Sequence, residues 1–164
     1  MKKFIIELKW ALLFFIAGLV WTFFEKFMGW HDEQIGKQAL YGTLFAVIAI
    51  GIYILALLDK KRNFYDGVMT WGQGFVAGAL ITVFIAVLSP FAQYLSYRII
   101  SPDYFQHITA YTLSHTSMTE KGAAAYYNLK SFMLQSVFTA LAMGIVTSAI
   151  VAYFVKSKNT NSTV

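Results

Sequence analysis

The sequence has no cysteine among its 164 residues. Disulfides, thiolate nucleophiles, iron–sulfur clusters and Cys-ligated zinc are therefore excluded. Charge is also scarce: Asp, Glu, Lys and Arg make up 13% of the chain, against roughly 25% in soluble domains. Apolar residues reach 58%. This composition excludes an ordinary soluble domain.

Charged residues are absent from four long segments. These segments are Trp10–Phe24, Gln38–Leu58, Gly67–Tyr97 and Ser131–Val155. A helix needs about 20 residues to cross roughly 30 Å of hydrocarbon, so the last three segments are long enough. The first segment is shorter, and we expect flanking charges such as Glu7 and Glu25 to extend their head groups into the two interfaces.

The sequence therefore predicts an all-α, integral membrane four-helix bundle. The expected spans are about 4–28, 38–58, 70–98 and 130–155, within one domain over residues 1–156. The polar tail, 157–164, is expected to be disordered.

The distribution of basic residues predicts the orientation. Eight lie at the two termini and in the second loop: Lys2, Lys3, Lys9, Lys60, Lys61, Arg62, Lys156 and Lys158. Five lie in the first and third loops: Lys26, Lys37, Arg98, Lys121 and Lys130. This bias favours both termini in the cytoplasm. Because most basic residues lie at the ends of apolar runs, the formal charge of +5 indicates contact with the lipid bilayer and not with nucleic acid.

The third loop is long enough to contain short helices. Ser101-Pro102-Asp103 is typical of a helix start, with Ser101 as the cap. Ser117 and Glu120 have the spacing of a capping box, which predicts a helix that runs into the fourth span. We therefore expect a short extra helix on the outer surface.

Ionisable residues of the first and third loops would share the outer side of the membrane. They are Glu25, His31, Asp32, Glu33, Asp103 and His107. Their types could ligate a divalent ion, but their spacing is not diagnostic, and ordinary solvated polarity is the alternative. We expect an outer polar patch that a partner contacts, and no metal site.

The third span contains Ser89-Pro90, followed one turn later by Gln93. Proline removes an amide donor and displaces the carbonyl of Ala86, which Ser89 or Gln93 could satisfy. Gln135 of the fourth span is a further polar candidate nearby. A broken helix at membrane depth is typical of transporter sites. A plain structural kink is the alternative, because no ionisable residue accompanies the proline.

Small residues recur at intervals of four in the third and fourth spans. The positions expected at helix contacts are Gly74, Gly78, Ala140, Gly144 and Ser148. Small residues let helices approach closely within lipid, where association depends on van der Waals contact. The partner could be the other helix or a second subunit.

Several short motifs resemble those of bacterial membrane proteins grouped as the domain of unknown function 4199 family. The motifs are Lys2-Lys3-Phe4, Lys9-Trp10, Glu25-Lys26, Gly29-Trp30-His31-Asp32-Glu33, Ala56-Leu57-Leu58-Asp59-Lys60, Gly67-Val68-Met69-Thr70, Ser89-Pro90, Pro102-Asp103-Tyr104-Phe105 and Asn128-Leu129-Lys130-Ser131. The resemblance implies a four-helix, multi-pass protein of the bacterial inner (plasma) membrane without an assigned activity. It implies no catalytic or ligand residues.

The sequence leaves two classes of function open. No nucleophile elbow, zinc-protease motif, phosphate loop or dinucleotide fingerprint occurs, so we expect no enzymatic activity, no catalytic residue and no cofactor. The first interpretation is a non-enzymatic scaffold or accessory subunit that assembles as a homo-oligomer or with a membrane protein partner. The alternative is a small-solute carrier or channel component built around Ser89-Pro90. Polar residues facing inward across several helices would favour the carrier.

Overall fold

The computed structural model describes residues 4–157, which are helical and contain no strand. Four stretches are long and apolar enough to cross a membrane, as predicted. They are α1 (Ile5–Phe27), the stretch Ile35–Asn63, the stretch Trp71–Ile100 and α7 (Leu129–Val155). The all-α four-helix membrane architecture is thus confirmed.

Two of these stretches are composite. The second contains α2 (Ile35–Tyr41), the short 3-10 helix η2 (Gly42–Leu44) and α3 (Phe45–Asn63). It extends beyond the expected 38–58 at both ends. The third contains α4 (Trp71–Leu95) and then the π-helical turn η3 (Ser96–Ile100).

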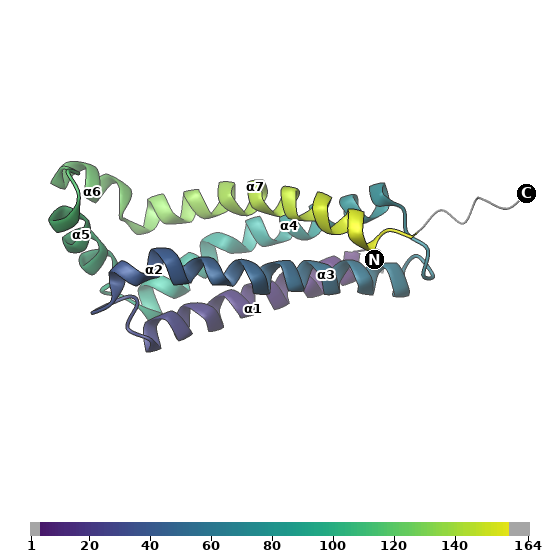
Figure 1. The fold of residues 1–164 in the computed structure, drawn as a ribbon, viewed down its shortest axis with the longest axis horizontal. Helices are drawn as coiled ribbons and strands as arrows, with labels where there is room; N and C mark the ends of the chain where they lie inside the picture. Colours follow the sequence, from purple (N-terminus) through teal and green to yellow (C-terminus); the bar gives the residue numbers. More distant parts are fainter. Residues whose placement is uncertain (1–3, 158–164) are drawn as a thin grey trace, which may run out of the picture.

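The four helices lie side by side, and both ends of the described chain lie at the same end of the bundle (Figure 1). We call this the termini end; the opposite end, with the α1–α2 connection, α5 and α6, is the loop end. The most extensive helix contact joins α4 to α7, and α1 packs against both α4 and α3.

The small residues of α4 and α7 face each other. A Cβ atom added at Gly78 would lie 2.6 Å from Ser148 Oγ, and one added at Gly144 would lie 2.5 Å from Thr82 Cγ2. One at Gly74 would lie 3.1 Å from the Cβ of Ala152. These distances are too short for a larger side chain, so close helix approach depends on these glycines.

A hydroxyl pair crosses this contact: Thr82 Oγ1 of α4 lies 3.4 Å from Ser148 Oγ of α7. Tyr53 OH of α3 lies 2.7 Å from the same Thr82 hydroxyl and so joins α3 to α4. Ser148 and Thr82 are fully buried, whereas Ala140 is partly buried against the core. Of the two partners considered for the small residues, the structure shows the neighbouring helix.

Of the two alternatives at Ser89-Pro90, the structure does not show the broken helix. α4 continues through Pro90 to Leu95. Ser89 Oγ donates to the carbonyl of Ala86 at 2.9 Å and so supplies the hydrogen bond that proline cannot make.

The third loop contains α5 (Tyr104–His115) and α6 (Glu120–Tyr126). The extra helix is confirmed, but the expected caps are wrong. Asp103, not Ser101, precedes α5, and Thr119 caps α6 by accepting from the Gly122 amide. The chain also does not run continuously from α6 into α7, because Asn128 begins a new helix by accepting from the Ser131 amide at 2.9 Å.

At the termini end, Glu7 does not extend into the interface as expected. It is 1% exposed and pairs with Lys60 of α3 at 2.8 Å. Nearby, Lys61 Nζ donates to the Val155 carbonyl at 2.9 Å and joins α3 to α7. Ser157, which we assigned to the tail, hydrogen-bonds Met69 of the α3–α4 connection. The rest of that tail, 158–164, lies outside the described residues.

Candidate functional site

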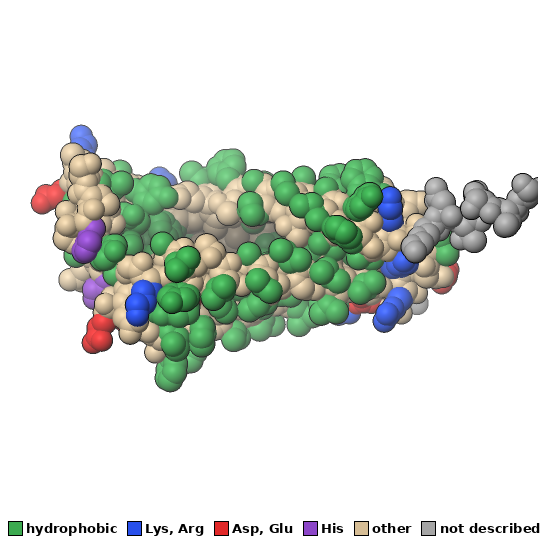
Figure 2. Space-filling view, in the orientation of Figure 1, with side chains coloured by type: hydrophobic (Ala, Val, Ile, Leu, Met, Phe, Trp, Pro, Cys, Tyr) green, Lys and Arg blue, Asp and Glu red, His purple; other side chains and the backbone are tan. Residues whose placement is uncertain are grey.

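A groove of about 810 Å³ lies between α1, α3, α4 and α7. Exposed side chains on α3 (Ala46 and Ile50) and on α7 (Thr139 and Met143) line it. The space-filling view shows the hollow between α7 and α3 (Figure 2). The groove therefore opens sideways, toward the region that lipid would occupy.

Polar side chains from three helices face this groove. Ser136 of α7 donates to Ser89 of α4 across 3.1 Å, and Ser96 of η3 donates to Thr22 of α1 across 3.3 Å. Gln135 of α7 also lines the groove. The groove thus combines an apolar opening with inward hydrogen-bonding groups, which is typical of small-molecule sites.

Gln93 has a different role from the one expected. It does not satisfy the Ala86 carbonyl, because Ser89 does. It lines the groove, and its Oε1 atom is buried without a hydrogen-bond partner in the described part of the chain. Buried polar atoms are normally paired, so this unpaired oxygen marks where the groove lacks a hydrogen-bond donor.

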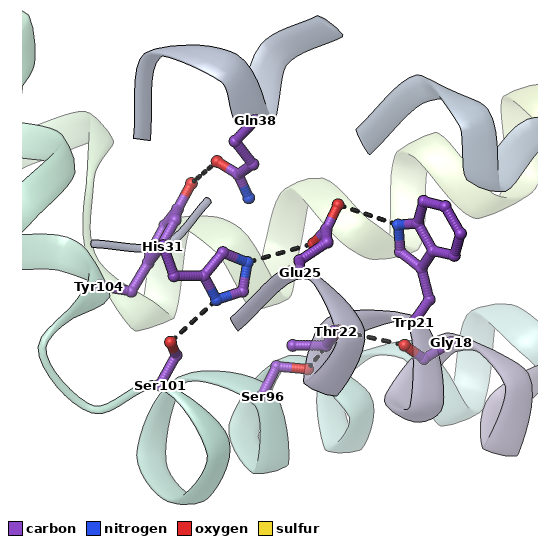
Figure 3. A network of polar contacts seen from close by, with 9 residues as sticks. All are labelled: Gly18, Trp21, Thr22, Glu25, His31, Gln38, Ser96, Ser101 and Tyr104. Carbon is purple, nitrogen blue, oxygen red and sulfur yellow. Dashed lines mark hydrogen bonds and ion pairs between the residues drawn. The ribbon is translucent and has the colours of Figure 1, made fainter. Parts of the chain in front are cut away.

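At the loop end, a buried network closes the groove around Glu25 (Figure 3). Glu25 accepts from Trp21 Nε1 at 2.9 Å, and its other oxygen lies 3.1 Å from His31 Nε2. His31 Nδ1 lies 2.8 Å from Ser101 Oγ. With an ionised Glu25, Nε2–H donates to the carboxylate and Nδ1 accepts from the Ser101 hydroxyl.

A second hydrogen bond crosses the loop end beside this network. Tyr104 OH of α5 donates to Gln38 Oε1 at 2.8 Å. Burial raises the pKa of Tyr104 to about 12, from an ordinary value of 10.0. Because Gln38 also lines the groove, this bond fixes one of its walls.

Ser101, His31 and Glu25 form the hydroxyl–imidazole–carboxylate series that hydrolases use. Here, however, Ser101 and His31 have 0% exposure, so no substrate can reach Ser101 Oγ in this structure. The series instead joins the α1–α2 connection to the segment between η3 and α5. We therefore assign it a positioning role.

Of the six residues expected in the outer patch, the structure brings four together. His107 Nδ1 lies 3.1 Å from the His31 carbonyl and 3.0 Å from Asp32 Oδ1, and Glu25 contacts His31 as described. Asp32 also pairs with Lys26 at 2.8 Å, and this hydrogen bond lowers the pKa of Asp32.

Glu33 and Asp103 complete the expected set, but their side chains are exposed. Asp103 contributes its backbone carbonyl, which accepts from the amides of Gln106 and His107. Among residues 4–157, no group of three or more His, Asp or Glu side chains is arranged to hold a metal ion.

The sequence interpretation missed Ser96, Ser101 and Thr22 as residues of this region. A signal was present for one of them: Ser96 follows Ser89 and Gln93 at intervals of four and three, which places all three on one helical face. No comparable signal pointed to Ser101, because its tertiary bond to His31 replaces the local capping bond expected from sequence.

A family model described as "Protein of unknown function (DUF4199)" matches residues 9–157. No curated protein and no solved structure matches the chain.

Proposed function

The chain belongs to the DUF4199 family of proteins of unknown function, and from this premise we propose that it binds a small, membrane-soluble molecule in the groove between α3 and α7. The observation that carries the proposal is the convergence of polar side chains from α1, α4 and α7 on one laterally open groove. Its volume of about 810 Å³ lies in the range of small-molecule sites. The role is that of a carrier or binding subunit and requires no chemical step.

The small-residue faces support this choice over a scaffold. A scaffold would use those faces to hold a second protein, but Gly78 and Gly144 are occupied by Ser148 and Thr82 of the same chain. Nor does the groove suit a partner's membrane helix. A helix is about 10 Å wide, so a volume of this size would hold only roughly two turns.

The proposal can be tested by filling the groove. Ala92 lines it from α4, whereas Ala142 of α7 is exposed and lies outside it. We expect Ala92→Phe to lose a lipid-like molecule that co-purifies with the wild-type protein, and Ala142→Phe to retain it. Native mass spectrometry of protein released from mild detergent measures the bound mass. Equal retention in both variants would place the molecule elsewhere and reject the proposal.

For the membrane arrangement, we propose the bacterial inner membrane with both termini in the cytoplasm. The eight-to-five distribution of basic residues supports this orientation. Reporter fusions after Val164 and within residues 110–118 provide the test. A cytoplasmic signal from the loop fusion would reverse the orientation.

A further inference from the structure

If the groove binds a small molecule, as proposed above, then the charges that line it restrict the charge of that molecule. Among residues 4–157, no Lys, Arg or His side chain lines it, and Glu25 is its only acidic residue. Both oxygens of Glu25 already have partners, Trp21 and His31. A phosphate or carboxylate group inside the groove would find no cation and would be repelled by Glu25. The lining therefore selects against anionic lipids.

The polar side chains of the groove also indicate which polar group a bound molecule would have. Gln93 Oε1 is the one lining atom in the described chain that is buried and lacks a hydrogen-bond partner. A side-chain amide presents an acceptor at one atom and donors at the other, and a hydroxyl can pair with either. The neighbouring Ser89–Ser136 contact is also made between hydroxyls.

The opening of the groove is suited to hydrocarbon. Ile50 of α3 and Met143 of α7 lie on opposite sides of it and are exposed. Phe14 and Phe45 line the groove and pack edge to face at 5.5 Å. An acyl or alkyl chain could therefore leave the groove sideways without exposing polar groups to lipid.

From these three features we infer that the groove binds a neutral lipid with a free hydroxyl group. The hydroxyl pairs with Gln93, and the chain leaves between α3 and α7. Diacylglycerol and long-chain alcohols share this chemistry, and both can be tested directly.

The first experiment compares lipids that differ only in charge. Purified full-length protein in phosphatidylcholine nanodiscs is titrated with diacylglycerol and with phosphatidate of the same chains, and with a long-chain alcohol and the matching fatty acid. We expect each neutral lipid to bind at least about tenfold more tightly than its anionic counterpart. The tighter of the two neutral lipids identifies the source. Equal or tighter binding of the anionic lipids would overturn the inference.

The second experiment tests the hydroxyl contact. Gln93→Leu should weaken diacylglycerol binding by roughly tenfold, the loss expected for one hydrogen bond. It should leave binding of the matching diacyl compound without the hydroxyl unchanged. Gln106→Leu, at an exposed position of α5 outside the groove, is the matched control and should retain wild-type affinity. Unchanged diacylglycerol binding in Gln93→Leu, or equal losses in both variants, would reject the assignment to Gln93.

Different results would reject the proposed function and the inference about ligand chemistry. If Ala92→Phe displaces a lipid that shows no preference for a neutral hydroxyl group, only the inference about ligand chemistry fails. If no lipid is displaced by Ala92→Phe, the proposed function itself fails.

Discussion

Each end of the bundle buries one carboxylate from α1, but the two carboxylates have different partners. At the termini end, Glu7 pairs with the ammonium group of Lys60 on α3, and its second oxygen, Oε2, has no hydrogen-bond partner in the described residues. At the loop end, both oxygens of Glu25 are bonded, to Trp21 and to His31.

The surrounding packing differs in the same way. At the termini end, α3 and α7 are joined through Lys61 and Val155. Toward the loop end, the groove separates these helices. One end therefore joins α1 to α3 through a buried ion pair, whereas the other end borders a cavity with a network of neutral and charged hydrogen bonds.

The largest expected effect comes from breaking the ion pair. Lys60→Met would leave Glu7 buried without a counter-ion, and we expect a loss of about 3–5 kcal/mol in the free energy of unfolding. Thermal unfolding in detergent measures it. Lys9→Met is the matched control at the same end: Lys9 is 50% exposed and pairs with Asp59, so its loss should cost about 1 kcal/mol or less.

A double variant sharpens this result. Glu7→Leu combined with Lys60→Met removes both charges, so it should recover most of the stability. If the double variant is no more stable than Lys60→Met alone, the buried charge is not the cause of the loss.

The next effect tests the helix contact between the two ends. Gly144→Leu or Gly78→Leu would insert a whole side chain at a position where even a Cβ atom would lie too close to Thr82 or Ser148. We expect a cost of about 1–3 kcal/mol for each. Ala142→Leu, at an exposed position of α7, should leave the unfolding temperature almost unchanged. Equal tolerance at all three sites would contradict the close contact.

A smaller effect is expected from Tyr104 at the loop end. Tyr104→Phe removes the hydrogen bond to Gln38 and should cost about 0.5–1.5 kcal/mol at neutral pH. Since burial raises the pKa of Tyr104 from 10.0 to about 12, its neutral form stabilises the fold below pH 10.0. This contribution is lost as pH rises toward 12.

Unfolding temperatures across this alkaline range provide the measurement. The difference between wild type and Tyr104→Phe should narrow as pH rises. Tyr126→Phe, at a tyrosine that is 48% exposed, should follow the wild type. A constant difference at every pH would show that Tyr104 does not contribute to alkaline sensitivity.

The smallest effect concerns Asp32. Its pKa is lowered mainly by the hydrogen bond from Lys26. The ionised form of Asp32 therefore stabilises the fold at pH values above the ordinary pKa of 3.8. This stabilisation is lost as the pH falls through the lowered pKa. The side chain is 30% exposed, which limits the gain to a few tenths of a kcal/mol. Asp32→Asn should lower the unfolding temperature slightly at neutral pH and not at strongly acidic pH. A larger loss at acidic pH would contradict this sign.

Sequence patterns were sufficient to predict the four long helices and the small-residue contact between α4 and α7. Charge-free length determines which segments can cross a membrane, and small residues at intervals of four indicate a close contact. They were not sufficient where a tertiary bond replaced a local one. Ser101 bonds His31 instead of capping α5, and Glu7 pairs with Lys60 instead of extending outward.

The position of the groove along the bundle has a consequence for transport. Its α7 lining runs from Phe132 to Thr147, and its α4 lining begins at Ile85. Neither reaches the termini end, where Lys61 joins α3 to α7. The groove therefore opens nearer the loop end, and under the proposed function its occupant would enter and leave from that half of the bundle. Transfer to the other half would require α3 and α7 to separate at the end where they are joined.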